Sequence, residues 1–403
     1  MDADFLILGA GPAGLMAAWT FARRRPNRPV VVVDRMSVAG AKLAVAGGGR
    51  GNLSHLATEE EFARAFGRQG RFAIPAYRAL PPDRLRDMLA ETGVATVVDA
   101  VGRIYPRSQS AGEVRDALAA ACRRAGVHFV FNRRVDNVLP PGPDRGGWQA
   151  DKFFARAILL AAGGRSAPQL GSDGSGWALA QRLGCELTPP VPALTGLQTV
   201  DDWPKRLSGL SLPDAALIVA GERDAATRGE LLFTHRGVSG PVVLDLSGRV
   251  ARRLLAEQEV RLELRLAIDA PNFPRLRQTA GTGSVRTWLA RQMPRALAAT
   301  LLELAGIPPE QTFSRLTAAQ EKTLRQCLAA VPLAINGTGG FADSMVTSGG
   351  IRLRQVCPDT LESRIHPALY FAGEILDLDG PTGGWNLHWA FCSGHLAGLS
   401  AAR

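Results

Sequence analysis

The sequence predicts an α/β fold in which a mainly parallel sheet is covered on both faces by helices. The first observation is an apolar run at residues 4–8 that ends in glycines and continues into a helix-forming stretch up to about residue 25. The second is the recurrence of buried-strand runs at residues 30–33 and 156–164. Helical stretches lie between these runs, and strands that alternate with helices along a chain are typical of parallel sheets.

The glycines after the first strand have the spacing of a dinucleotide-binding turn. Gly9, Gly11 and Gly14 form the pattern GxGxxG, with Pro12 and Ala13 between them. In such a turn the first glycine permits a tight bend, the second lets the backbone approach a diphosphate, and the third lets the helix pack closely on the strand. The positive end of the helix that follows favours the same diphosphate.

An acidic residue follows the second strand at the distance that this turn requires. Asp34 lies 20 residues after Gly14 and directly after the run 30–33, with Arg35 beside it. A carboxylate at this place accepts hydrogen bonds from a ribose diol and repels a 2′-phosphate. Strand, glycine turn, helix and carboxylate are in register, so the sequence predicts a dinucleotide site here.

The net charge of +10 invites a nucleic-acid interpretation, which the distribution of the charge weakens. Of the 47 basic residues only four are lysines, and the arginines are spread along the chain. The one compact basic cluster, at residues 23–28, lies at the end of the first helix, where a solvated helix end explains it more simply than a binding patch. A nucleic acid is therefore not expected as a partner.

The five cysteines are isolated from one another, and none belongs to a CxxC pair. This spacing argues against a redox-active disulfide, a zinc site and a secreted disulfide framework, so no metal is expected. The uncharged stretch 5–22 follows Asp2 and Asp4 and is interrupted by GAGPAG, which argues against a signal peptide and a membrane helix. The sequence therefore predicts a cytoplasmic protein with no membrane contact.

The middle of the chain has a different character, which predicts an insertion. Beyond residues 189–192, the stretch 260–268 alternates between apolar and other side chains, as in a half-buried strand. Two helical stretches follow at residues 285–305 and 318–330, and Thr317 and Gln320 form a capping-box pair before the second. We therefore predict a cofactor-binding domain at residues 1–190, a β-rich insertion at 191–270, a helical insertion at 271–335 and a return to the first domain at 336–403.

Four blocks of the sequence carry a resemblance to a known family. They are GAGPAG at residues 9–14, GAKLAVAGGGRGNLS at 40–54, GELLFTHRGVSGP at 229–241, and residues 346–398, which contain LYFAGEILDLDGPTGGWNL. Over nearly its whole length the chain resembles a bacterial flavoprotein family that includes aminoacetone oxidase-like and bile-acid dehydro-reductase-like NAD(P)/FAD-dependent oxidoreductases. The resemblance implies FAD as the cofactor and a glutathione-reductase-like FAD-binding Rossmann domain, interrupted by a β-rich domain and a small helical domain.

The resemblance also implies particular contacts with FAD. Asp34 would hold the adenosine ribose, Glu374 would approach the ribityl chain, and a final helix that opens near Gly383 would point at the pyrimidine edge of the flavin. A helix N-terminus there stabilises the negative charge of a reduced flavin. The predicted cofactor-binding residues are Gly9, Gly11, Pro12, Ala13, Gly14, Asp34, Arg35, Lys42, Gly48, Gly49, Arg50, Asn52, Ala162, Gly163, Gly373, Glu374, Gly383, Gly384, Asn386 and Leu387.

The chain departs from the family pattern in one block. Where the family has the sequence GRKLLISGGGRCNVT, with a cysteine after GGGR, this chain has Gly51, so no chemistry of that cysteine carries over. A second GxGxxG after a strand is also missing, which argues against a dedicated NAD(P)H domain. The loop at residues 171–176 is rich in glycine, but it does not follow a strand closely enough to predict a second nucleotide site.

Two histidines are the catalytic candidates, because a flavin carries the hydride step itself and leaves the protein at most a proton to supply. His235 lies in the polar loop LFTHRGVSGP, which the resemblance places over the flavin, and it is predicted to contact substrate or act in acid–base catalysis. His388 lies on the final helix, and the face on which it lies decides its role. A structural histidine is the alternative at both positions.

The predicted function is that of an FAD-dependent oxidoreductase that transfers hydride between a small organic substrate and NAD(P)H or oxygen, with NAD(P)H as a transient reductant. Two alternatives remain open. One is a flavin-dependent RNA-modifying or RNA-binding protein, which the basic charge favours and the missing cysteine opposes. The other is a non-catalytic flavin-binding protein. The sequence does not reveal the substrate, the preferred nicotinamide or the oligomeric state.

Overall fold

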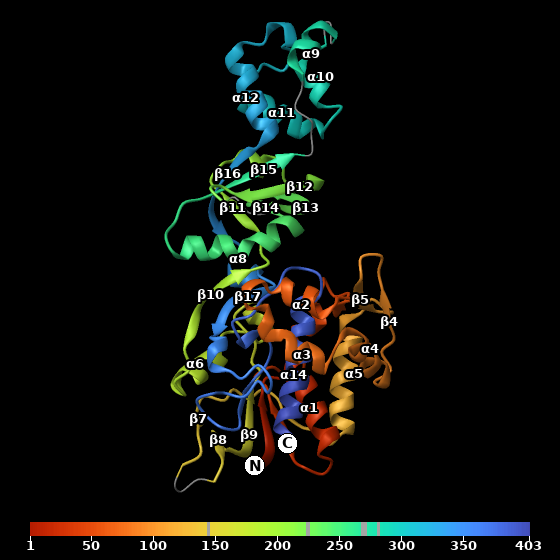
Figure 1. Ribbon diagram of the computed structural model, residues 1–403, viewed down its shortest axis with the longest axis vertical. Helices are drawn as coiled ribbons and strands as arrows, with labels where there is room; N and C mark the ends of the chain where they lie inside the picture. Colours follow the sequence, from red (N-terminus) through yellow and green to blue (C-terminus); the bar gives the residue numbers. More distant parts are fainter. Residues whose placement is uncertain (143–145, 223–225, 267–271, 280–282) are drawn as a thin grey trace. The chain divides into compact units, whose positions relative to one another are not determined.

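The computed structural model describes residues 1–142, 146–222, 226–266, 272–279 and 283–403 (Figure 1). The chain forms two compact units. Unit 1 contains Met1–Ala193 and Phe341–Arg403, and unit 2 contains Leu194–Gly340. Unit 2 contains both predicted insertions except residues 191–193, which belong to unit 1. The predicted boundary between the insertions, at residues 270 and 271, lies outside the described residues.

Unit 1 is built around a seven-stranded sheet. Its strands are β6 (His128–Val130), β2 (Val30–Val33), β1 (Asp2–Leu8), β9 (Phe153–Leu160), β8 (Trp148–Ala150) and β7 (Val138–Leu139) in that order, with β18 (Leu369–Phe371) also paired to β9. The pairs among β6, β2, β1, β9 and β18 are parallel, as the sequence predicts, whereas β7 and β8 form an antiparallel edge. The four valines of β2 are all buried, which is typical of a parallel strand covered on both faces.

Three long helices pack beside this sheet. They are α1 (Pro12–Arg24), α5 (Ala111–Arg124) and α14 (Trp385–Ala401). The first and last helices of the chain, α1 and α14, lie side by side (Figure 1). The segments at the two ends of the sequence therefore form one structural layer.

The remaining elements of unit 1 form smaller groups. Helices α2 (Glu59–Ala65), α3 (Ile74–Ala79), α4 (Pro82–Glu91) and α6 (Ser175–Arg182) connect the sheets. A second sheet contains β3 (Ser54–His55), β5 (Arg103–Pro106) and β4 (Thr96–Val98), and a third contains β10 (Leu187–Ala193) and β17 (Val346–Ile351), which are antiparallel. The four-residue helix α13 (Gly340–Asp343) precedes β17.

Unit 2 contains a closed six-stranded barrel. Its strands, in order around the barrel, are β11 (Leu197–Thr199), β14 (Gly237–Ser239), β13 (Thr227–Thr234), β12 (Ser211–Val219), β15 (Val260–Leu266) and β16 (Val331–Thr338). In β15 the side chains of Val260, Leu262 and Leu264 are buried and those of Arg261 and Arg265 are exposed, which is the alternation that the sequence predicts. Residues 267 and 268 of the predicted strand lie outside the described residues.

Helices complete unit 2. They are α7 (Trp203–Arg206), α8 (Pro241–Leu255), α9 (Phe273–Thr279), α10 (Val285–Leu289), α11 (Arg295–Leu304) and α12 (Ala318–Ala329). The single helix predicted at residues 285–305 is wrong in one respect, because it is divided into α10 and α11 at Pro294, which caps α11. Proline lacks the N–H that a helix interior requires. The predicted capping box of Thr317 and Gln320 is confirmed at the start of α12.

Candidate functional site

The glycine turn after β1 is closely packed at two of its three glycines and open at the other. A Cβ on Gly9 would lie 2.4 Å from the Ala161 carbonyl oxygen, and a Cβ on Gly14 would lie 1.9 Å from the Gly9 carbonyl oxygen. A Cβ on Gly11 would have no atom within 4 Å. Gly11 therefore faces open space at the N-terminus of α1, where Pro12 is the first helical residue and Ala13 is buried. This is the place where a diphosphate would meet free N–H groups.

Asp34 ties the end of β2 to the glycine turn. Its Oδ2 accepts a hydrogen bond from the Ala10 N–H at 2.6 Å, and its Oδ1 accepts one from the Met36 N–H at 2.7 Å. Burial raises the pKa of Asp34, while these two hydrogen bonds and the neighbouring Arg35 act in the opposite direction. Each carboxylate oxygen has a second lone pair, so the group is positioned to accept hydrogen bonds from a ribose diol.

The side chain of Arg35 is held by the protein rather than free to bind a ligand. Its guanidinium forms an ion pair with Asp173 and donates to the Pro168 carbonyl oxygen at 3.2 Å. Asp173 belongs to the glycine-rich loop at residues 171–176. Its Oδ2 also forms an ion pair with a guanidinium nitrogen of Arg134, at 3.5 Å. We infer that Arg35 fixes this loop beside the Asp34 carboxylate.

The turn at residues 47–51 presents a second open surface. Gly47, Gly48, Gly49 and Gly51 have φ angles of +59°, +67°, +84° and +78°, a region that side chains disfavour. A Cβ on Gly48 or Gly49 would have no atom within 4 Å. The backbone here is exposed to an empty volume that a flat ring system can approach closely.

The turn has little room for a side chain at Gly51, and the Arg50 side chain binds other residues of the protein. A Cβ on Gly51 would lie 3.2 Å from atoms of Ala111 and Pro106, so the turn as folded leaves little room for the cysteine of the family pattern. The guanidinium of Arg50 lies over the ring of Tyr105, 4.8 Å from its centre, and Arg50 Nε donates to Gln109 at 3.0 Å. The side chain of Arg50 is exposed, so only its backbone is placed to line the open surface.

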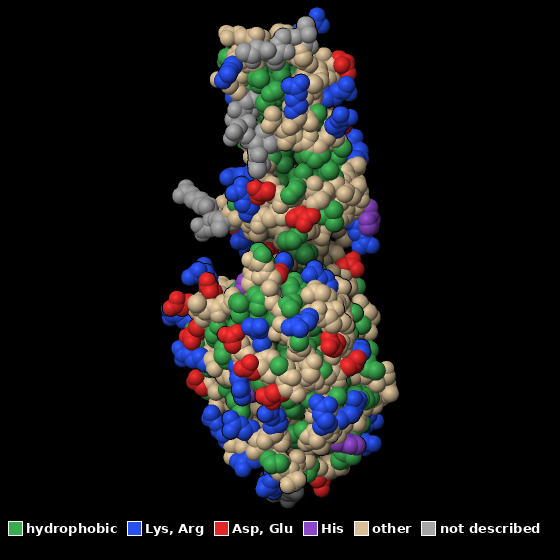
Figure 2. Space-filling model, turned by 90° about the vertical axis from the view of Figure 1, so that its right-hand side faces the viewer, with side chains coloured by type: hydrophobic (Ala, Val, Ile, Leu, Met, Phe, Trp, Pro, Cys, Tyr) green, Lys and Arg blue, Asp and Glu red, His purple; other side chains and the backbone are tan. Residues whose placement is uncertain are grey.

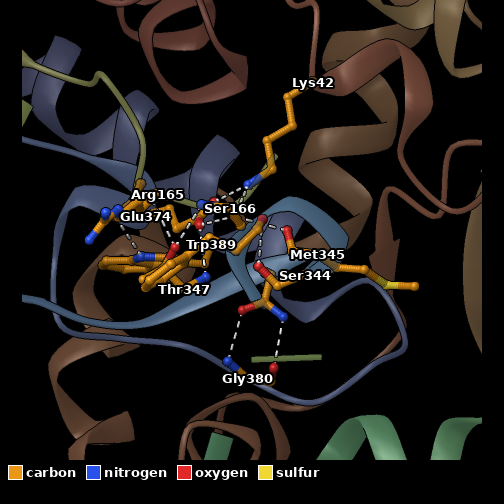
Figure 3. Close-up of polar contacts among 12 residues, drawn as sticks. Lys42, Arg165, Ser166, Ser344, Met345, Thr347, Glu374, Gly380 and Trp389 are labelled. Atoms are coloured by element: carbon orange, nitrogen blue, oxygen red, sulfur yellow. Dashed lines mark hydrogen bonds and ion pairs between the residues drawn. The ribbon is translucent and has the colours of Figure 1, made fainter. Parts of the chain in front are cut away.

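Lys42 and Glu374 form the polar centre of the site (Figure 3). Lys42 Nζ donates to Glu374 Oε2 at 2.6 Å and to the Ser166 hydroxyl at 2.5 Å. Glu374 Oε1 accepts hydrogen bonds from the Ser166 hydroxyl at 2.7 Å and from the Thr347 N–H at 2.9 Å. The side chains of Lys42 and Glu374 are 24% and 20% exposed, so the pair is largely removed from water yet still reachable by a ligand.

Ser166 and Thr347 are the two members of this network that the sequence did not predict. The Thr347 hydroxyl accepts from the N–H groups of Arg165 and Ser166, at 2.9 and 3.0 Å. Ser166 follows the strand β9 by six residues, and Thr347 lies in β17. The sequence offers only a weak signal for them, a small polar residue shortly after β9 and another near the start of β17.

The end of β9 borders the same region. Gly163 has φ +74°, and a Cβ there would lie 2.7 Å from the Ser172 hydroxyl. Ala162 contacts α6, because its Cβ would lie 2.9 Å from a Cβ on Gly176. Both residues therefore lie between the glycine turn and the glycine-rich loop.

The N-terminus of α14 completes the site. Gly383 and Gly384 have φ angles of +119° and +98°, and a Cβ on Gly384 would lie 2.6 Å from Asn52 Oδ1. Asn52 Oδ1 is buried and has no hydrogen-bond partner among the described residues. A buried acceptor without a partner is costly in a native protein, which indicates a ligand or water donor at this point.

Two predicted contacts in α14 have internal roles. The Asn386 side chain accepts from the Gly380 N–H at 2.8 Å and donates to the Gly380 carbonyl oxygen at 2.8 Å and to the Pro381 carbonyl oxygen at 3.2 Å (Figure 3). Leu387 is partly buried and packs against the core of unit 1. These side chains position the first turn of α14, whose N–H groups have no partner within the helix.

The two ends of the sequence meet beside this turn. A Cβ on Gly373, which has φ +76°, would lie 3.0 Å from Ala13 Cβ at the start of α1. The Gly373 N–H donates to the Ser393 hydroxyl of α14 at 2.9 Å. The start of α1, the Gly373–Glu374 turn and α14 are thus directly connected within unit 1.

The two histidine candidates lie in different environments. His388 is completely buried, with its Nδ1 2.9 Å from the Ser54 hydroxyl and its Nε2 2.9 Å from the Leu80 carbonyl oxygen. Burial lowers its pKa to about 4, so it is neutral near pH 7. This geometry favours the structural alternative for His388, and we do not retain it as a catalytic candidate. His235 is exposed at the turn between β13 and β14 of unit 2.

We name the open region of unit 1 the cofactor cradle. It comprises Gly11, Asp34, Lys42, Gly48, Gly49, Asn52, Glu374 and the first turn of α14. Its three open glycines, the ribose-type acceptor Asp34 and the unpartnered Asn52 oxygen fit a ligand with a diphosphate, a ribose and a flat ring. No group of three or more metal-ligating side chains occurs among the described residues, and none of the described helices is long and apolar enough to cross a membrane.

Comparison with known proteins agrees with this geometry. Residues 3–400 match the family described as HI0933-like protein Rossmann domain. The chain is 32% identical to the 3-dehydro-bile acid delta(4,6)-reductase of Clostridium scindens, over 98% of each chain. It is 28% identical to the ribosomal RNA dihydrouridine synthase of Haemophilus influenzae, over 99% of this chain and 98% of that one.

Among solved structures, the fold is similar to that of a 3-ketosteroid delta1-dehydrogenase from Sterolibacterium denitrificans in complex with 1,4-androstadiene-3,17-dione. The TM-score is 0.55 and the identity is 14%, and the match covers 100% of this chain and 99% of that one. At this identity the likeness concerns the fold alone.

Proposed function

The chain belongs to the family of HI0933-like Rossmann-domain proteins, and from this premise we propose that it uses FAD to reduce a small organic substrate at the expense of NAD(P)H. The family resemblance noted in the sequence and the predicted fold class are confirmed. The protein is an FAD-dependent oxidoreductase. The observation that carries the proposal is the cofactor cradle, in which three open glycines, Asp34 and the start of α14 lie in one unit.

The cradle fits FAD in three separate places. The open backbone at Gly11 would receive the diphosphate, and Asp34 would accept from the adenosine ribose. Gly48 and Gly49 would lie against the ring system, and the unpaired N–H groups of the first turn of α14 would face its pyrimidine edge. When bound, FAD supplies the two-electron chemistry, and the protein supplies orientation and a fixed electrostatic environment.

The names of two relatives support the proposed direction of electron flow. Delta(4,6)-reductase and dihydrouridine synthase both denote reductions. We therefore place the organic substrate as the hydride acceptor and NAD(P)H as the donor, so that one NAD(P)H and one proton are consumed for each substrate molecule reduced. Oxygen is the competing acceptor. His235 stays a prediction as a substrate-contacting or proton-donating residue.

Anaerobic reduction of the bound flavin tests the proposal. The FAD-loaded protein is mixed with NADH or NADPH, and the loss of flavin absorbance near 450 nm is followed. The reduced protein is then mixed with a panel of α,β-unsaturated ketones, uridine oligonucleotides, or oxygen. Faster reoxidation by a small unsaturated ketone than by oxygen supports the proposal. A protein that takes up no flavin contradicts it, and a flavin that no nicotinamide or substrate reduces favours a non-catalytic flavin-binding protein.

RNA modification is the second candidate, since two relatives that match over 98% and 96% of their length are ribosomal RNA dihydrouridine synthases. Two observations speak against it: the lower identity of those matches, and Gly51 in place of the cysteine of the family pattern. Basic side chains are also interspersed with acidic ones on the face shown in Figure 2. Reoxidation of the reduced protein by a uridine oligonucleotide, with formation of dihydrouridine, would replace the first proposal with this one.

A further inference from the structure

Unit 1 has a cavity of about 490 Å³ whose walls contain five arginines. We call it the arginine pocket and define it by Arg68, Arg71, Arg352, Arg354 and Arg364. None of the residues that line it belongs to the cofactor cradle. The five arginines come from three separate stretches of the sequence, so no local run of basic residues reveals the pocket.

The positive charge of the arginine pocket is only partly compensated. Arg352 and Arg354 share one carboxylate oxygen, Glu186 Oε2, at 3.0 and 2.5 Å. In the part of the chain that the structure describes, the side chains of Arg68, Arg71 and Arg364 have no hydrogen-bond or ion-pair partner. Like charges gathered around one cavity favour an anionic ligand.

A single acidic side chain lines the arginine pocket, and neutral donors already bind it. Asp377 is 6% exposed, and its Oδ2 accepts from the Thr188 hydroxyl at 2.6 Å and from Gln69 Nε2 at 3.4 Å. Its N–H donates to the Ile351 carbonyl oxygen at 3.0 Å. Asp377 is therefore a fixed part of the wall, and the guanidinium groups remain available to a ligand.

The backbone that carries the arginines is well ordered by its own contacts. Arg68 and Arg71 lie three residues apart on the 3₁₀-helix η2 (Gly67–Ala73), so their side chains leave the same face. The Arg364 N–H donates to the Gln355 carbonyl oxygen at 2.8 Å, which joins Arg364 to the 3₁₀-helix η5 (Leu353–Gln355). These contacts fix the backbone that carries Arg68, Arg71 and Arg364, whose exposed side chains a ligand can reach.

Part of the wall is apolar. It includes Phe72, Leu353, Val356 and Pro358. Phe72 is itself supported by Trp389, with ring centres 6.2 Å apart. A bare inorganic anion would use only the arginines, whereas a ligand with a planar ring and phosphate groups would use both parts of the wall. The cavity volume also lies within the range of small-molecule sites, about 300–1,000 Å³.

From these observations we propose that the arginine pocket binds a phosphate-bearing nucleotide, with the phosphates on Arg68, Arg71 and Arg364 and the base against Phe72. A base that carries phosphate groups can come from two ligands, a free nucleotide or the adenosine half of NADPH. The proposal rests on unit 1 alone and does not depend on which substrate the flavin reduces.

Calorimetric titration of the FAD-loaded protein at low ionic strength tests the proposal. The probes are ADP, 2′,5′-ADP, pyrophosphate and a short oligoribonucleotide. The test variant is Arg68→Gln/Arg71→Gln, and Arg364→Gln is a second, independent variant. The control is Arg124→Gln, which changes an exposed arginine at the end of α5. Melting temperature and flavin absorbance verify that each variant is folded and still holds FAD.

We expect ADP or 2′,5′-ADP to bind the wild type and to bind both pocket variants at least about tenfold more weakly, while the control is unchanged. A preference for 2′,5′-ADP identifies NADPH as the source, and equal binding of the two identifies a nucleotide without a 2′-phosphate. Equal affinity for pyrophosphate and ADP would overturn the nucleotide assignment. Undiminished binding in the pocket variants, no nucleotide binding, or binding of the oligoribonucleotide alone would overturn the site, the last of these in favour of an RNA contact.

Discussion

Gly394 of α14 lies directly against Ala13 of α1. A Cβ on Gly394 would be 2.2 Å from the Ala13 carbonyl oxygen. This distance is too short for any side chain, so the contact requires glycine. Gly398, one turn later, has the same relationship to the Ala17 carbonyl oxygen, at 2.6 Å. These two glycines allow the last helix to pack on the helix that follows the dinucleotide-binding turn, and so bring the two ends of the chain into one cofactor site.

Substitution of Gly394 by alanine should separate α1 from α14. We expect Gly394→Ala to lower the free energy of unfolding by about 1–3 kcal/mol because the added methyl group overpacks a backbone contact. Gly112→Ala is the matched control, since Gly112 lies in α5 and its Cβ would have only Ser110 Oγ nearby, at 3.5 Å. Thermal denaturation followed by circular dichroism measures both. Equal melting temperatures for the two variants would show that the helices do not need this contact.

Gly11 and Gly14 should respond differently to the same change. Gly11→Ala places a methyl group in open space, so the apoprotein should lose about 1 kcal/mol or less, whereas the FAD dissociation constant should rise at least about tenfold. Gly14→Ala should instead impair folding, because its Cβ would meet the Gly9 carbonyl oxygen at 1.9 Å. The quenching of FAD fluorescence on binding measures the affinity. An unchanged affinity in Gly11→Ala would place the diphosphate elsewhere.

Lys42 and Glu374 should be energetically coupled. Lys42→Met leaves Glu374 in a largely buried position with one fewer donor, so it should weaken FAD binding or stability more than the double variant Lys42→Met/Glu374→Gln does. We expect a coupling energy of roughly 1–3 kcal/mol in a double-mutant cycle. Losses that simply add would mean that the two residues act separately, in spite of their 2.6 Å contact.

The buried His388 should make the protein sensitive to acid. Its pKa is lowered from 6.5 to about 4 in the folded state, so between these values the unfolded chain binds the additional proton. The free energy of unfolding should therefore fall as the pH is lowered from 6.5 towards 4, by roughly 3 kcal/mol for this residue.

The variant His388→Gln isolates this effect from the many carboxylates that also titrate. It should be less stable than the wild type at pH 7 and should lose less stability between pH 6.5 and 4. Urea denaturation at a series of pH values provides the comparison. Parallel pH profiles for the two proteins would assign the acid sensitivity to other groups.

The parts of the site that could be predicted from the sequence are those whose chemistry is local. The turn at Gly9–Gly14 and the carboxylate of Asp34 are spaced by one strand, one helix and one strand, so their meeting follows from the topology. The parallel sheet and the capping box of α12 were predictable for the same reason. A pattern within a few tens of residues determines each of them.

The features that the sequence did not reveal depend on contacts between distant segments. Ser166 and Thr347 meet at Glu374 only after β9 and β17 are placed, and the arginine pocket combines residues near 68, 352 and 364. The burial of His388 depends on Ser54 and Leu80, which no helical periodicity specifies. The single helix predicted at residues 285–305 is divided for a local reason, because Pro294 cannot supply the N–H that a continuous helix needs.

The insertion begins and ends at neighbouring points of the backbone. Near its two ends, the Gly339 N–H donates to the Gly196 carbonyl oxygen at 2.9 Å, and just outside it Ala193 pairs with Val346 in the β10–β17 ladder. A closed barrel also leaves no strand edge to be capped. The two ends of unit 2 are consequently close enough for a short turn to join them. Unit 2 could be deleted or exchanged for a homologous insertion without changing the path of the chain in unit 1.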